Sequence, residues 1–330
     1  MLFIEGEVVE DLITYGDAIE SVREAFKAHG TKRSQMPPKT YIFFEEFNGD
    51  FRVMPAYLED LEAAGVKIVN VHPDNPHEHE LPSVMAMIVL LDPETGKPFS
   101  ILDGTEITNY RTGAAGSVGA EQLAKEGSDK VGIIGTGAQA RTQLHCLNQL
   151  FDLKRVKAYD KFEESRNSYA KDMSKATGLD IKPVDDPEIA VRDVDIVVTT
   201  TPSTEPIIEE GWISNGAHIN AVGADAEGKQ ELEIGLLEKS KIVIDEWEQA
   251  SHSGEISEAV SKGVITKENI HGNIGEVITG RKPGRQSEEE ITIFDSTGLA
   301  VQDISTAWTV YQKALEEGRG DDRDFLSLEK

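Results

Sequence analysis

The feature that most constrains this chain is a glycine-rich turn at residues 135–140, which reads GTGAQA and follows the short apolar run VGII. Glycines at 135 and 137 permit a tight turn and a close approach of the backbone to a pyrophosphate. The small Ala140 lets the helix expected to begin near Ala138 pack closely on the strand before it. The N-terminus of that helix supplies N–H donors for phosphate oxygens. We therefore predict a strand–turn–helix unit that binds a nucleotide.

A second apolar run, RVKAY, ends at Asp160, 20 residues beyond Ala140. An acidic residue at this spacing is placed to accept hydrogen bonds from the hydroxyls of an adenosine ribose. The carboxylate of Asp160 would also repel a 2′-phosphate, an effect that the neighbouring Lys161 reduces only slightly. The prediction is therefore a dinucleotide site that takes NAD rather than NADP.

After residue 128, short apolar runs alternate with segments that are compatible with helices. Uninterrupted apolar strands that alternate with helices indicate a parallel sheet covered on both faces. The fold class predicted for residues 128–298 is therefore α/β, a Rossmann-type doubly wound parallel sheet. The strand-like runs are VGIIG (131–135), RVKAYD (155–160), DIVVTTT (195–201), HINAVGAD (218–225) and KIVIDE (241–246).

Residues 1–127 show a different pattern, in which strand-like runs follow one another through short turns. This order favours an antiparallel or mixed sheet. The final helix, expected over Leu299–Glu316, carries one broad apolar stripe and could return to cover this first domain. We predict an α+β domain over 1–127, completed by 299–330, with a weakly held tail from Gly318. The expected elements of the first domain are a helix over Tyr15–Ala28 and strands at Tyr41–Phe44, Phe51–Pro55, Val66–Val71 and Val84–Leu91.

The charge of the chain is strongly negative, with 60 acidic against 33 basic residues and a formal net charge of −27. Such a surface disfavours nonspecific binding to nucleic acid or to anionic membranes. No apolar run approaches the ~20 residues that a membrane crossing needs. We expect a soluble cytoplasmic protein, and we interpret the scattered acids as adaptation to high salt, the alternative being a merely acidic protein.

Other motifs point to little further chemistry. The single cysteine, Cys146, excludes an intramolecular disulfide, and neither a GxSxG nucleophile motif nor a P-loop is present. Three histidines in HPDNPHEHE (72–80) could ligate a metal, but we favour a polar, proline-containing loop, partly because hydride transfer needs no metal. No metal site is therefore predicted.

Nine segments, several of them long and unusual, give the chain a clear resemblance. The sequence resembles the ornithine cyclodeaminase/mu-crystallin family, and within it the archaeal alanine dehydrogenase branch, up to about residue 318. The segments are QMPPK (35–39), FRVMPAYL (51–58), KIVNVHPDNP (67–76), LPSVMAMIVLLDPETG (81–96), YRTGAAGS (110–117), IGTGAQA (134–140), VTTTPS (198–203), HINAVGADAEGKQEL (218–232) and ITIFDSTGLAVQD (291–303).

The resemblance implies that Arg52, Lys67 and Arg111 surround the substrate and the nicotinamide. Residue chemistry agrees, because a guanidinium binds a carboxylate through two hydrogen bonds, and a desolvated lysine beside other cations exchanges protons near neutral pH. Lys67 is thus implied as proton donor and acceptor, and Arg52 as the group that holds the substrate carboxylate. The alternatives are an outward-facing Arg52 on an edge strand, a Lys67 that reaches solvent, and a helix-packing role for the segment at Arg111.

Asp225, expected at the end of the strand HINAVGAD, is implied to orient the substrate amine or a water. Lys229 and Ser296 are weaker candidates, since Lys229 could be a surface lysine and Ser296 could merely cap the last helix. The full set of expected cofactor contacts is Arg111, Thr112, Gly135, Gly137, Ala138, Gln139, Tyr159, Asp160, Lys161, Val222, Gly223, Ala224, Lys229 and Ser296.

The activity that the resemblance implies is reversible oxidation of L-alanine by NAD to pyruvate and ammonium, in a homodimer. The resemblance leaves three other functions open, because members of the family with the same fold differ in function. One is cyclodeamination of ornithine to proline with recycled NAD, and another is reduction of cyclic ketimines. The third is a non-catalytic protein, similar to mu-crystallin, that binds a nucleotide and a small ligand.

Overall fold

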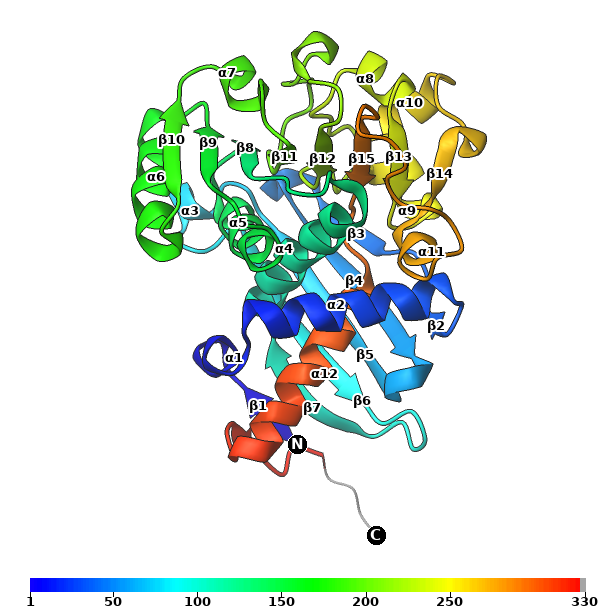
Figure 1. Ribbon diagram of the computed structural model, residues 1–330. Helices are drawn as coiled ribbons and strands as arrows, with labels where there is room; N and C mark the ends of the chain where they lie inside the picture. The colour runs from blue at the N-terminus through cyan, green and yellow to red at the C-terminus, as the bar shows by residue number, and fades with distance from the viewer. Residues whose placement is uncertain (327–330) are drawn as a thin grey trace. The chain divides into compact units, whose positions relative to one another are not determined.

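A computed structural model describes residues 1–326 of the chain, which form two compact units (Figure 1). Unit 1 comprises Met1–Arg111 together with the chain from Leu299, and unit 2 comprises Thr112–Gly298. The first boundary therefore lies inside helix α4 (Gly104–Leu123), at residue 111 rather than at the 127 expected from the sequence. The sequence pattern changes only where strands and helices begin to alternate. The helix itself already joins unit 2 at Gly113, which lies against Thr142.

Unit 1 is built on an eight-stranded mixed sheet with the order β16-β1-β7-β6-β5-β4-β2, in which β3 also pairs with β4. Neighbouring strands are antiparallel except for the parallel pair β1–β7. The four strands expected in this region are confirmed, each within three residues of its predicted ends. The strands are β1 (Leu2–Ile4), β2 (Ser34–Gln35), β3 (Thr40–Phe44), β4 (Gly49–Leu58), β5 (Ala63–Val71), β6 (Val84–Leu91), β7 (Pro98–Asp103) and β16 (Asp321–Asp322).

Two long helices cover one face of this sheet, α2 (Tyr15–Gly30) and α12 (Ala300–Glu317), as Figure 1 shows. Every second residue of β4 is buried, including Met54 and Leu58, and α12 brings Ile304 close to Gly65 on β5. A hydrogen bond of 2.8 Å from Ser305 Oγ to the carbonyl of Ser21 joins the two helices. Both predicted helices are confirmed. The short helices of this unit are α1 (Gly6–Leu12) and α3 (Asn75–Glu78).

The segment after α12 is not the loose tail expected from the sequence. Strand β16 pairs with β1, with Leu2 opposite Asp322. The ammonium group of Met1 donates hydrogen bonds to Asp322 Oδ1 (2.9 Å) and to the carbonyl of Arg323 (2.8 Å). A pairing partner more than 300 residues away leaves no local pattern, which is why the prediction was wrong. The last residues of the expected tail, 327–330, lie outside the described part of the chain.

Unit 2 is a parallel sheet of eight strands in the order β10-β9-β8-β11-β12-β15-β13-β14. The predicted doubly wound sheet is confirmed. Strands β10, β14 and β15 were not predicted, because β10 contains charges and a proline, β14 (IHGN) has a single apolar residue, and β15 (TIFD) has only two, between polar ones. The strands are β8 (Lys130–Ile134), β9 (Arg155–Tyr159), β10 (Asp180–Val184), β11 (Ile196–Thr199), β12 (His218–Ala221), β13 (Lys241–Ile244), β14 (Ile270–Asn273) and β15 (Thr292–Asp295).

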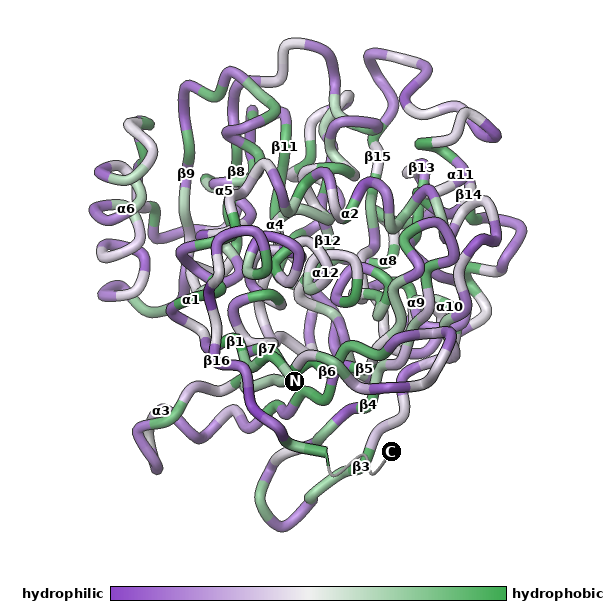
Figure 2. The backbone as a smooth tube through the Cα atoms, turned by 90° about the horizontal axis from the view of Figure 1, so that it is seen from below, coloured by the Kyte–Doolittle hydropathy of each residue, from purple (hydrophilic) through white to green (hydrophobic). Residues whose placement is uncertain are grey.

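Hydrophobic cores lie on both faces of this sheet. Ile196 and Val198 face one core together with Leu144, whereas Val197 faces the other together with Leu236. Helix α6 covers the edge of the sheet with few apolar residues and is mostly hydrophilic along its length (Figure 2). The helices are α5 (Ala138–Leu150), α6 (Glu163–Thr177), α7 (Pro187–Val191), α8 (Ile234–Glu238), α9 (Trp247–Ser253), α10 (Ser257–Ser261) and α11 (Ile274–Ile278).

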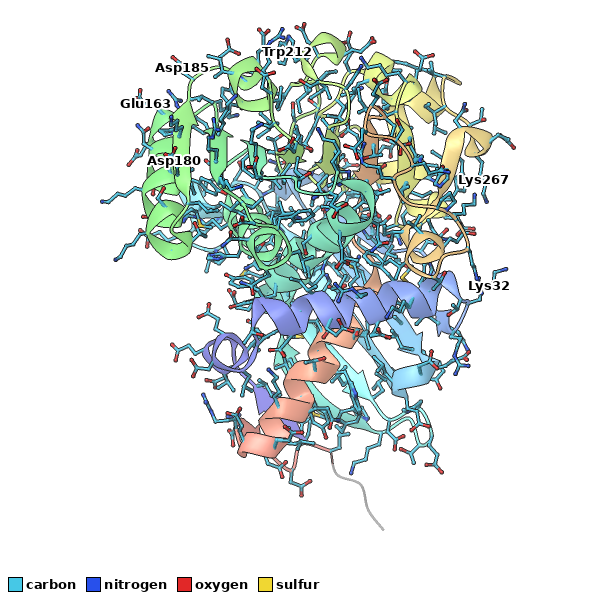
Figure 3. The ribbon with its side chains drawn as sticks, viewed as in Figure 1. Lys32, Glu163, Asp180, Asp185, Trp212 and Lys267 are labelled. Atoms are coloured by element: carbon cyan, nitrogen blue, oxygen red, sulfur yellow. The ribbon has the colours of Figure 1, made fainter. Side chains whose placement is uncertain are left out.

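The negative charge is spread over unit 2 rather than collected in one segment. In Figure 3 the labelled side chains of Glu163, Asp180 and Asp185 project outward from α6, β10 and the segment that follows β10. No helix within residues 1–326 is both long enough and apolar enough to cross a membrane.

Four acidic side chains of unit 2 are completely buried: Glu231, Asp245, Glu255 and Asp295. Each accepts hydrogen bonds from backbone N–H groups in the segments that follow the strands. Glu255 Oε1 accepts from Leu232 at 2.6 Å, Asp295 Oδ2 accepts from Ile256 at 3.1 Å, and Asp245 Oδ2 accepts from Gly298 at 2.8 Å. These carboxyl groups therefore supply the acceptors that these segments lack outside the sheet.

Burial raises the pKa values of three of these acids, because water no longer solvates the charged form. The pKa of Asp295 rises from 3.8 to about 8, through burial and then through repulsion by Asp245. The pKa of Glu255 is raised well above its ordinary value by burial and by the nearby Glu231, whose own pKa burial also raises. At neutral pH the cluster is therefore partly protonated.

The raised pKa of Asp295 makes stability depend on pH. Between about pH 4 and pH 8 the unfolded chain has lost this proton while the folded chain keeps it, so the free energy of unfolding falls as the pH rises. We expect Asp295→Asn to reduce this fall, because asparagine does not titrate. Thermal and denaturant unfolding from pH 5 to pH 8 measures it, with Asp185→Asn as the exposed control. An equal pH slope in Asp295→Asn and the unsubstituted protein would contradict the assignment.

Candidate nucleotide site and cation cluster

The glycine-rich turn joins β8 to α5 in unit 2. Gly135 has φ of +86°, and a Cβ there would lie 2.8 Å from Thr201 Cγ2 and 3.0 Å from the carbonyl of Thr200. Gly137 is the N-cap residue of α5, which begins at Ala138 as expected, and a Cβ on Gly137 would meet no other atom. The backbone thus leaves open space in front of the helix N-terminus, as a bound pyrophosphate requires.

Asp160 follows β9 and is held against this turn. Its Oδ2 accepts hydrogen bonds from the backbone N–H (2.9 Å) and the hydroxyl (3.0 Å) of Thr136, and its Oδ1 accepts from the N–H of Phe162 (3.0 Å). The amine of Lys161 lies over the Phe162 ring, 4.9 Å from its centroid, and Tyr159 is half-buried. The carboxylate therefore has a fixed orientation beside the glycine turn.

The segments after β11 and β12 approach each other closely. A Cβ on Gly223 would lie 2.4 Å from the carbonyl of Thr201, so no other residue fits there without a shift. Glu231 joins the two segments, accepting from the N–H of Thr201 at 2.6 Å through Oε1 and from that of Gly223 at 3.0 Å through Oε2. Val222 donates its N–H to the carbonyl of Thr199 at 3.1 Å, and Ala224 is buried. Glu231 was not among the residues predicted from the sequence.

Asp225 does not end a strand, because β12 stops at Ala221 and Asp225 lies in the loop beyond it. The run HINAVGAD is continuous in sequence, but the turn at Val222–Gly223 breaks the pairing. Asp225 Oδ1 accepts a hydrogen bond of 2.6 Å from Lys229 Nζ, so two separately predicted residues form one partly exposed ion pair.

The remaining expected cofactor contacts of unit 2 lie at various depths. Ser296 is buried just after β15 and donates its N–H to Ala221. It does not cap the last helix, whose N-cap residue is Leu299, so that alternative is wrong. Thr112 is buried in α4, where its carbonyl accepts from Gln143, and Gln139 is half-buried in the first turn of α5.

In unit 1, Arg52 lies on the buried face of β4. Its Nε and Nη2 donate to Asp50 Oδ1 (2.8 Å) and Oδ2 (3.1 Å), and its guanidinium carbon lies 5.1 Å from the centroid of the Tyr41 ring. The outward-facing alternative is therefore wrong. Asp50 and Tyr41 fix the plane of the guanidinium group, a geometry that suits a second planar carboxylate.

Lys67 lies on the buried face of β5 and is 1% exposed. Its Nζ donates to Asp303 Oδ1 at 2.7 Å and to Thr108 Oγ1 at 3.3 Å. The pKa of this amine is lowered from 10.5 to about 7, mainly by burial and then by the positive charge of Arg111, while Asp303 opposes both effects. The expected desolvated lysine is confirmed, and the solvent-reaching alternative is wrong.

Arg111, in α4, completes the cluster. Its Nη1 donates to Gln302 Oε1 at 3.0 Å, and its Nε lies 2.8 Å from Asp303 Oδ1. Asp303 is fully buried in the first turn of α12 and was not predicted as a site residue. One sequence feature could have indicated Asp303. It is an acidic residue directly before Ile304, which belongs to the apolar stripe of the final helix. We call Arg52, Lys67, Arg111 and Asp303 the cation cluster.

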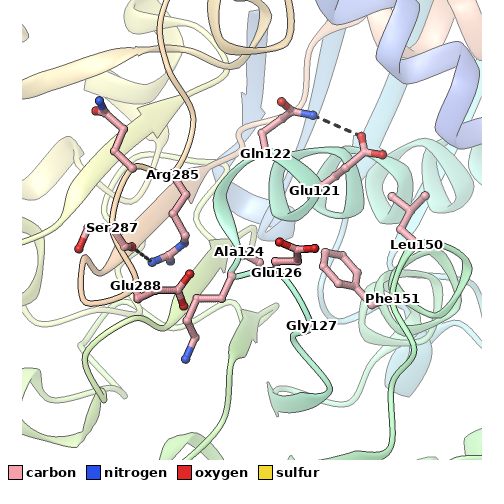
Figure 4. Close-up of a pocket in the computed structure, with 12 residues that line it drawn as sticks. Glu121, Gln122, Ala124, Glu126, Gly127, Leu150, Phe151, Arg285, Ser287 and Glu288 are labelled. Atoms are coloured by element: carbon pink, nitrogen blue, oxygen red, sulfur yellow. Dashed lines mark hydrogen bonds between the residues drawn. The ribbon is translucent and has the colours of Figure 1, made fainter.

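A separate hollow of 610 Å³ lies in unit 2, lined by the end of α4, the end of α5 and residues 285–288 (Figure 4). These segments precede β8, β9 and β15, so the hollow lies at the amino ends of the strands. Arg285 projects there, but it donates to the carbonyls of Leu123, Ser287, Glu290 and Ala217. These hydrogen bonds join backbone segments of unit 2 to one another. Nucleotides bind parallel sheets at the opposite edge, where the carboxyl ends of the strands lie, so this hollow is not the candidate nucleotide site.

Within residues 1–326, no three histidine, cysteine or acidic side chains are placed to share a metal ion. Of the histidines in the polar loop, His72 stacks on the ring of Phe44 with 5.9 Å between centroids.

The chain is similar to several known dehydrogenases and reductases. The chain is 48% identical to an alanine dehydrogenase of Archaeoglobus fulgidus, over 99% of each chain. It is similar to the solved structure of an archaeal alanine dehydrogenase dimer with bound NAD (TM-score 0.95, 48% identity, 99% of each chain). It is also similar to Thermococcus litoralis Δ1-pyrroline-2-carboxylate reductase in complex with NADH and L-proline (TM-score 0.95, 40% identity, 98% of this chain and 100% of that one).

The family model described as ornithine cyclodeaminase/mu-crystallin matches residues 2–318, almost the whole described chain. The predicted resemblance is thereby confirmed, and the protein belongs to the ornithine cyclodeaminase/mu-crystallin family.

Proposed function

We propose that the protein is an NAD-dependent alanine dehydrogenase, which converts L-alanine and water reversibly to pyruvate and ammonium. The observation that carries this proposal is the buried amine of Lys67, with a pKa of about 7, next to a guanidinium group. Such an amine exchanges protons at neutral pH, and guanidinium groups bind carboxylates. The relationship to an alanine dehydrogenase at 48% identity supports the choice of substrate.

The residues of unit 2 fit NAD. Gly135 and Gly137 leave room for the pyrophosphate before the N-terminus of α5, and the fixed carboxylate of Asp160 suits the adenosine ribose hydroxyls. Val222 and Gly223, held by Glu231, are the proposed support for the nicotinamide. When bound, NAD accepts the hydride from the α-carbon of the substrate.

In the proposed mechanism Arg52 holds the substrate carboxylate, with its plane fixed by Asp50 and Tyr41. Lys67 accepts a proton from the α-ammonium group of the substrate before the imine forms. Its ammonium form returns that proton to the nitrogen that leaves after water has added to the imine, and the proton lost by the water passes to solvent. Asp225, ion-paired with Lys229, is the proposed group that orients the amine or the water. The protein thus contributes positioning and proton transfer.

The function is tested by absorbance at 340 nm with purified protein, NAD and a panel of amino acids. We expect net NADH formation with L-alanine. Release of ammonia and proline from ornithine without accumulation of NADH would instead indicate cyclodeamination. Nucleotide binding with no turnover of any substrate would indicate a binding protein.

The variant Lys67→Ala tests the proposed role of this amine in proton transfer, and we expect its kcat to fall by roughly 10²-fold or more. A nearly normal kcat would remove Lys67 from the reaction.

A second candidate is reduction of a cyclic imine. It is favoured by the 40% identity to a reductase whose structure contains NADH and L-proline. The same assay in reverse distinguishes the two, with NADH and either pyruvate plus ammonium or Δ1-pyrroline-2-carboxylate. The substrate with the higher kcat/KM identifies the activity.

The choice of coenzyme is tested at Asp160. We expect Asp160→Ala to weaken NAD binding and to narrow the preference for NAD over NADP, because the variant loses ribose contacts and no longer repels a 2′-phosphate. The ratio of kcat/KM for the two coenzymes measures this preference. Asp172→Ala, which removes an exposed carboxylate on α6, is the matched control. An unchanged ratio in Asp160→Ala would contradict the ribose assignment.

The uncovered face of the sheet in unit 1 supports a homodimer. The residues facing away from α12 are apolar across three strands, with Val53 opposite Ile68 and Ile68 opposite Met87. On this face Ile42, which lies opposite Phe51, and Met87 are 50% and 48% exposed. A second copy of this chain is the occupant we propose for this face, in line with the dimer described for the archaeal alanine dehydrogenase.

The dimer is tested by sedimentation or light scattering. The chain has a mass of 36.2 kDa, so we expect a species of about twice that mass. Ile68→Glu should yield a folded monomer, because it places a charge in the proposed interface. Leu315→Glu, at an exposed position of α12 away from this face, should remain dimeric. A monomeric unsubstituted protein, or a dimeric Ile68→Glu, would refute this interface.

A further inference from the structure

The first turn of α12 places an acidic side chain against the sheet of unit 1. Asp303 is fully buried, and the helix lies directly on β5, since a Cβ on Gly65 would come within 2.9 Å of Ile304 Cδ1. A carboxylate in such a place is strongly destabilising unless opposite charges compensate it. Its partners therefore define its role.

Asp303 holds two cations through one oxygen. Its Oδ1 lies 2.7 Å from Lys67 Nζ and 2.8 Å from Arg111 Nε. The neighbouring Gln302 holds the other end of the guanidinium group, accepting from Arg111 Nη1 at 3.0 Å, and it also accepts from the N–H of Leu299 at 3.2 Å. The start of α12 thus fixes both cations at once.

The charges that face Lys67 are mostly positive. Arg111 on α4 and Lys39, in the segment before β3, both lower its pKa, whereas Asp303 raises it. On β4 its direct neighbour is the uncharged Met54, and the same face carries the mutually paired Arg52 and Asp50. On β6 its neighbour is the uncharged Ile88. The carboxylate in direct contact with the amine is that of Asp303.

We propose that Asp303 is a positioning residue, which aims the Lys67 amine and balances the charge of Arg111, so that the amine gives and takes protons at neutral pH. This inference rests on the proposed function, because it concerns the proton exchange assigned to Lys67. The same contact serves both directions of the reaction. A base is required when the amino acid is oxidised, and an acid is required when the imine is reduced.

The test is the pH dependence of kcat/KM in Asp303→Asn. In amino-acid oxidation Lys67 acts as the free base, so activity should fall below about pH 7 in the unsubstituted protein. Asparagine keeps the shape but removes the negative charge that favours the ammonium form. We expect this acidic limb to move to lower pH by at least about 1 unit. In the reverse direction the alkaline limb should move the same way, with loss of activity at pH 7–8.

Two variants separate this role from a merely structural one. Asp303→Glu keeps the charge but moves the carboxylate by one methylene, so the limb should stay in place while kcat falls. Asp50→Asn is the matched control, because it also neutralises a buried carboxylate of unit 1, but one that contacts Arg52 rather than Lys67. It should raise KM without moving the limb.

Gln302→Glu gives an independent test if Asp303→Asn does not fold. It adds a carboxylate where Arg111 and a backbone N–H already donate, so we expect a folded protein whose acidic limb moves to higher pH. An unmoved limb in a folded Asp303→Asn, or in Gln302→Glu, overturns the proposal.

Direct observation of Lys67 distinguishes failure of this inference from failure of the proposed function. Lysine side chains labelled at Cε report ammonium titration by NMR, and Lys67→Ala assigns the signal. We expect a midpoint near pH 7 that falls in Asp303→Asn. An identical midpoint in both proteins overturns the role of Asp303 alone. A kinetic limb that persists in Lys67→Ala instead removes Lys67 from the proposed mechanism.

Discussion

The burial of one ammonium group is the constraint around which unit 1 is organised. Lys67 is nearly inaccessible, and desolvation is the largest effect that lowers its pKa to about 7. A strand position that faces a helix ordinarily carries an apolar side chain, so a titratable amine at position 67 is less favourable for packing. Asp303 reduces the free-energy cost of burying this amine, because an opposite charge at 2.7 Å compensates part of the lost hydration. The helix that carries Asp303 therefore has a chemical role in addition to covering the sheet.

In unit 2, buried acidic side chains hold the loops at the carboxyl edge of the parallel sheet. Where strands end, the backbone loses its partners in the sheet, yet a nucleotide site needs loops of fixed shape. Buried carboxyl groups contribute to that shape, and the side chain of Glu231 accepts hydrogen bonds from both the segment after β11 and the segment after β12. Side-chain acceptors allow these segments to adopt geometries that no strand pairing would permit, such as the contact of Gly223 with Thr201. The consequence is a set of acids whose pKa values are raised by burial and by one another.

The sequence predicted those parts of the fold that depend on local pattern. The glycine turn, the alternating strands of unit 2 and the helix at Tyr15 all follow from residues close together in the chain. The pairing of β16 with β1 and the contact of Asp303 with Lys67 join residues hundreds of positions apart, so periodicity could not show them. The coil at Asp225 was mistaken for strand because Val222 and Gly223 continue an apolar run. Salt adaptation stays a prediction, since it rests on charge count and not on any contact.

The roles proposed for the charges of unit 1 match what the proposed substrates have in common. L-alanine and a cyclic imino acid both carry a carboxylate and a nitrogen on the α-carbon, so a fixed guanidinium group and a neutral-range amine suit either one. A single arrangement of Arg52, Lys67, Arg111 and Asp303 is therefore compatible with the different activities of the relatives at 48% and 40% identity. Discrimination must then come from groups that meet the rest of the substrate, where a methyl group and a ring differ in volume rather than in charge. Such a difference in size is worth only about 1–3 kcal/mol per methylene, which favours divergence of substrate without change of the charged residues.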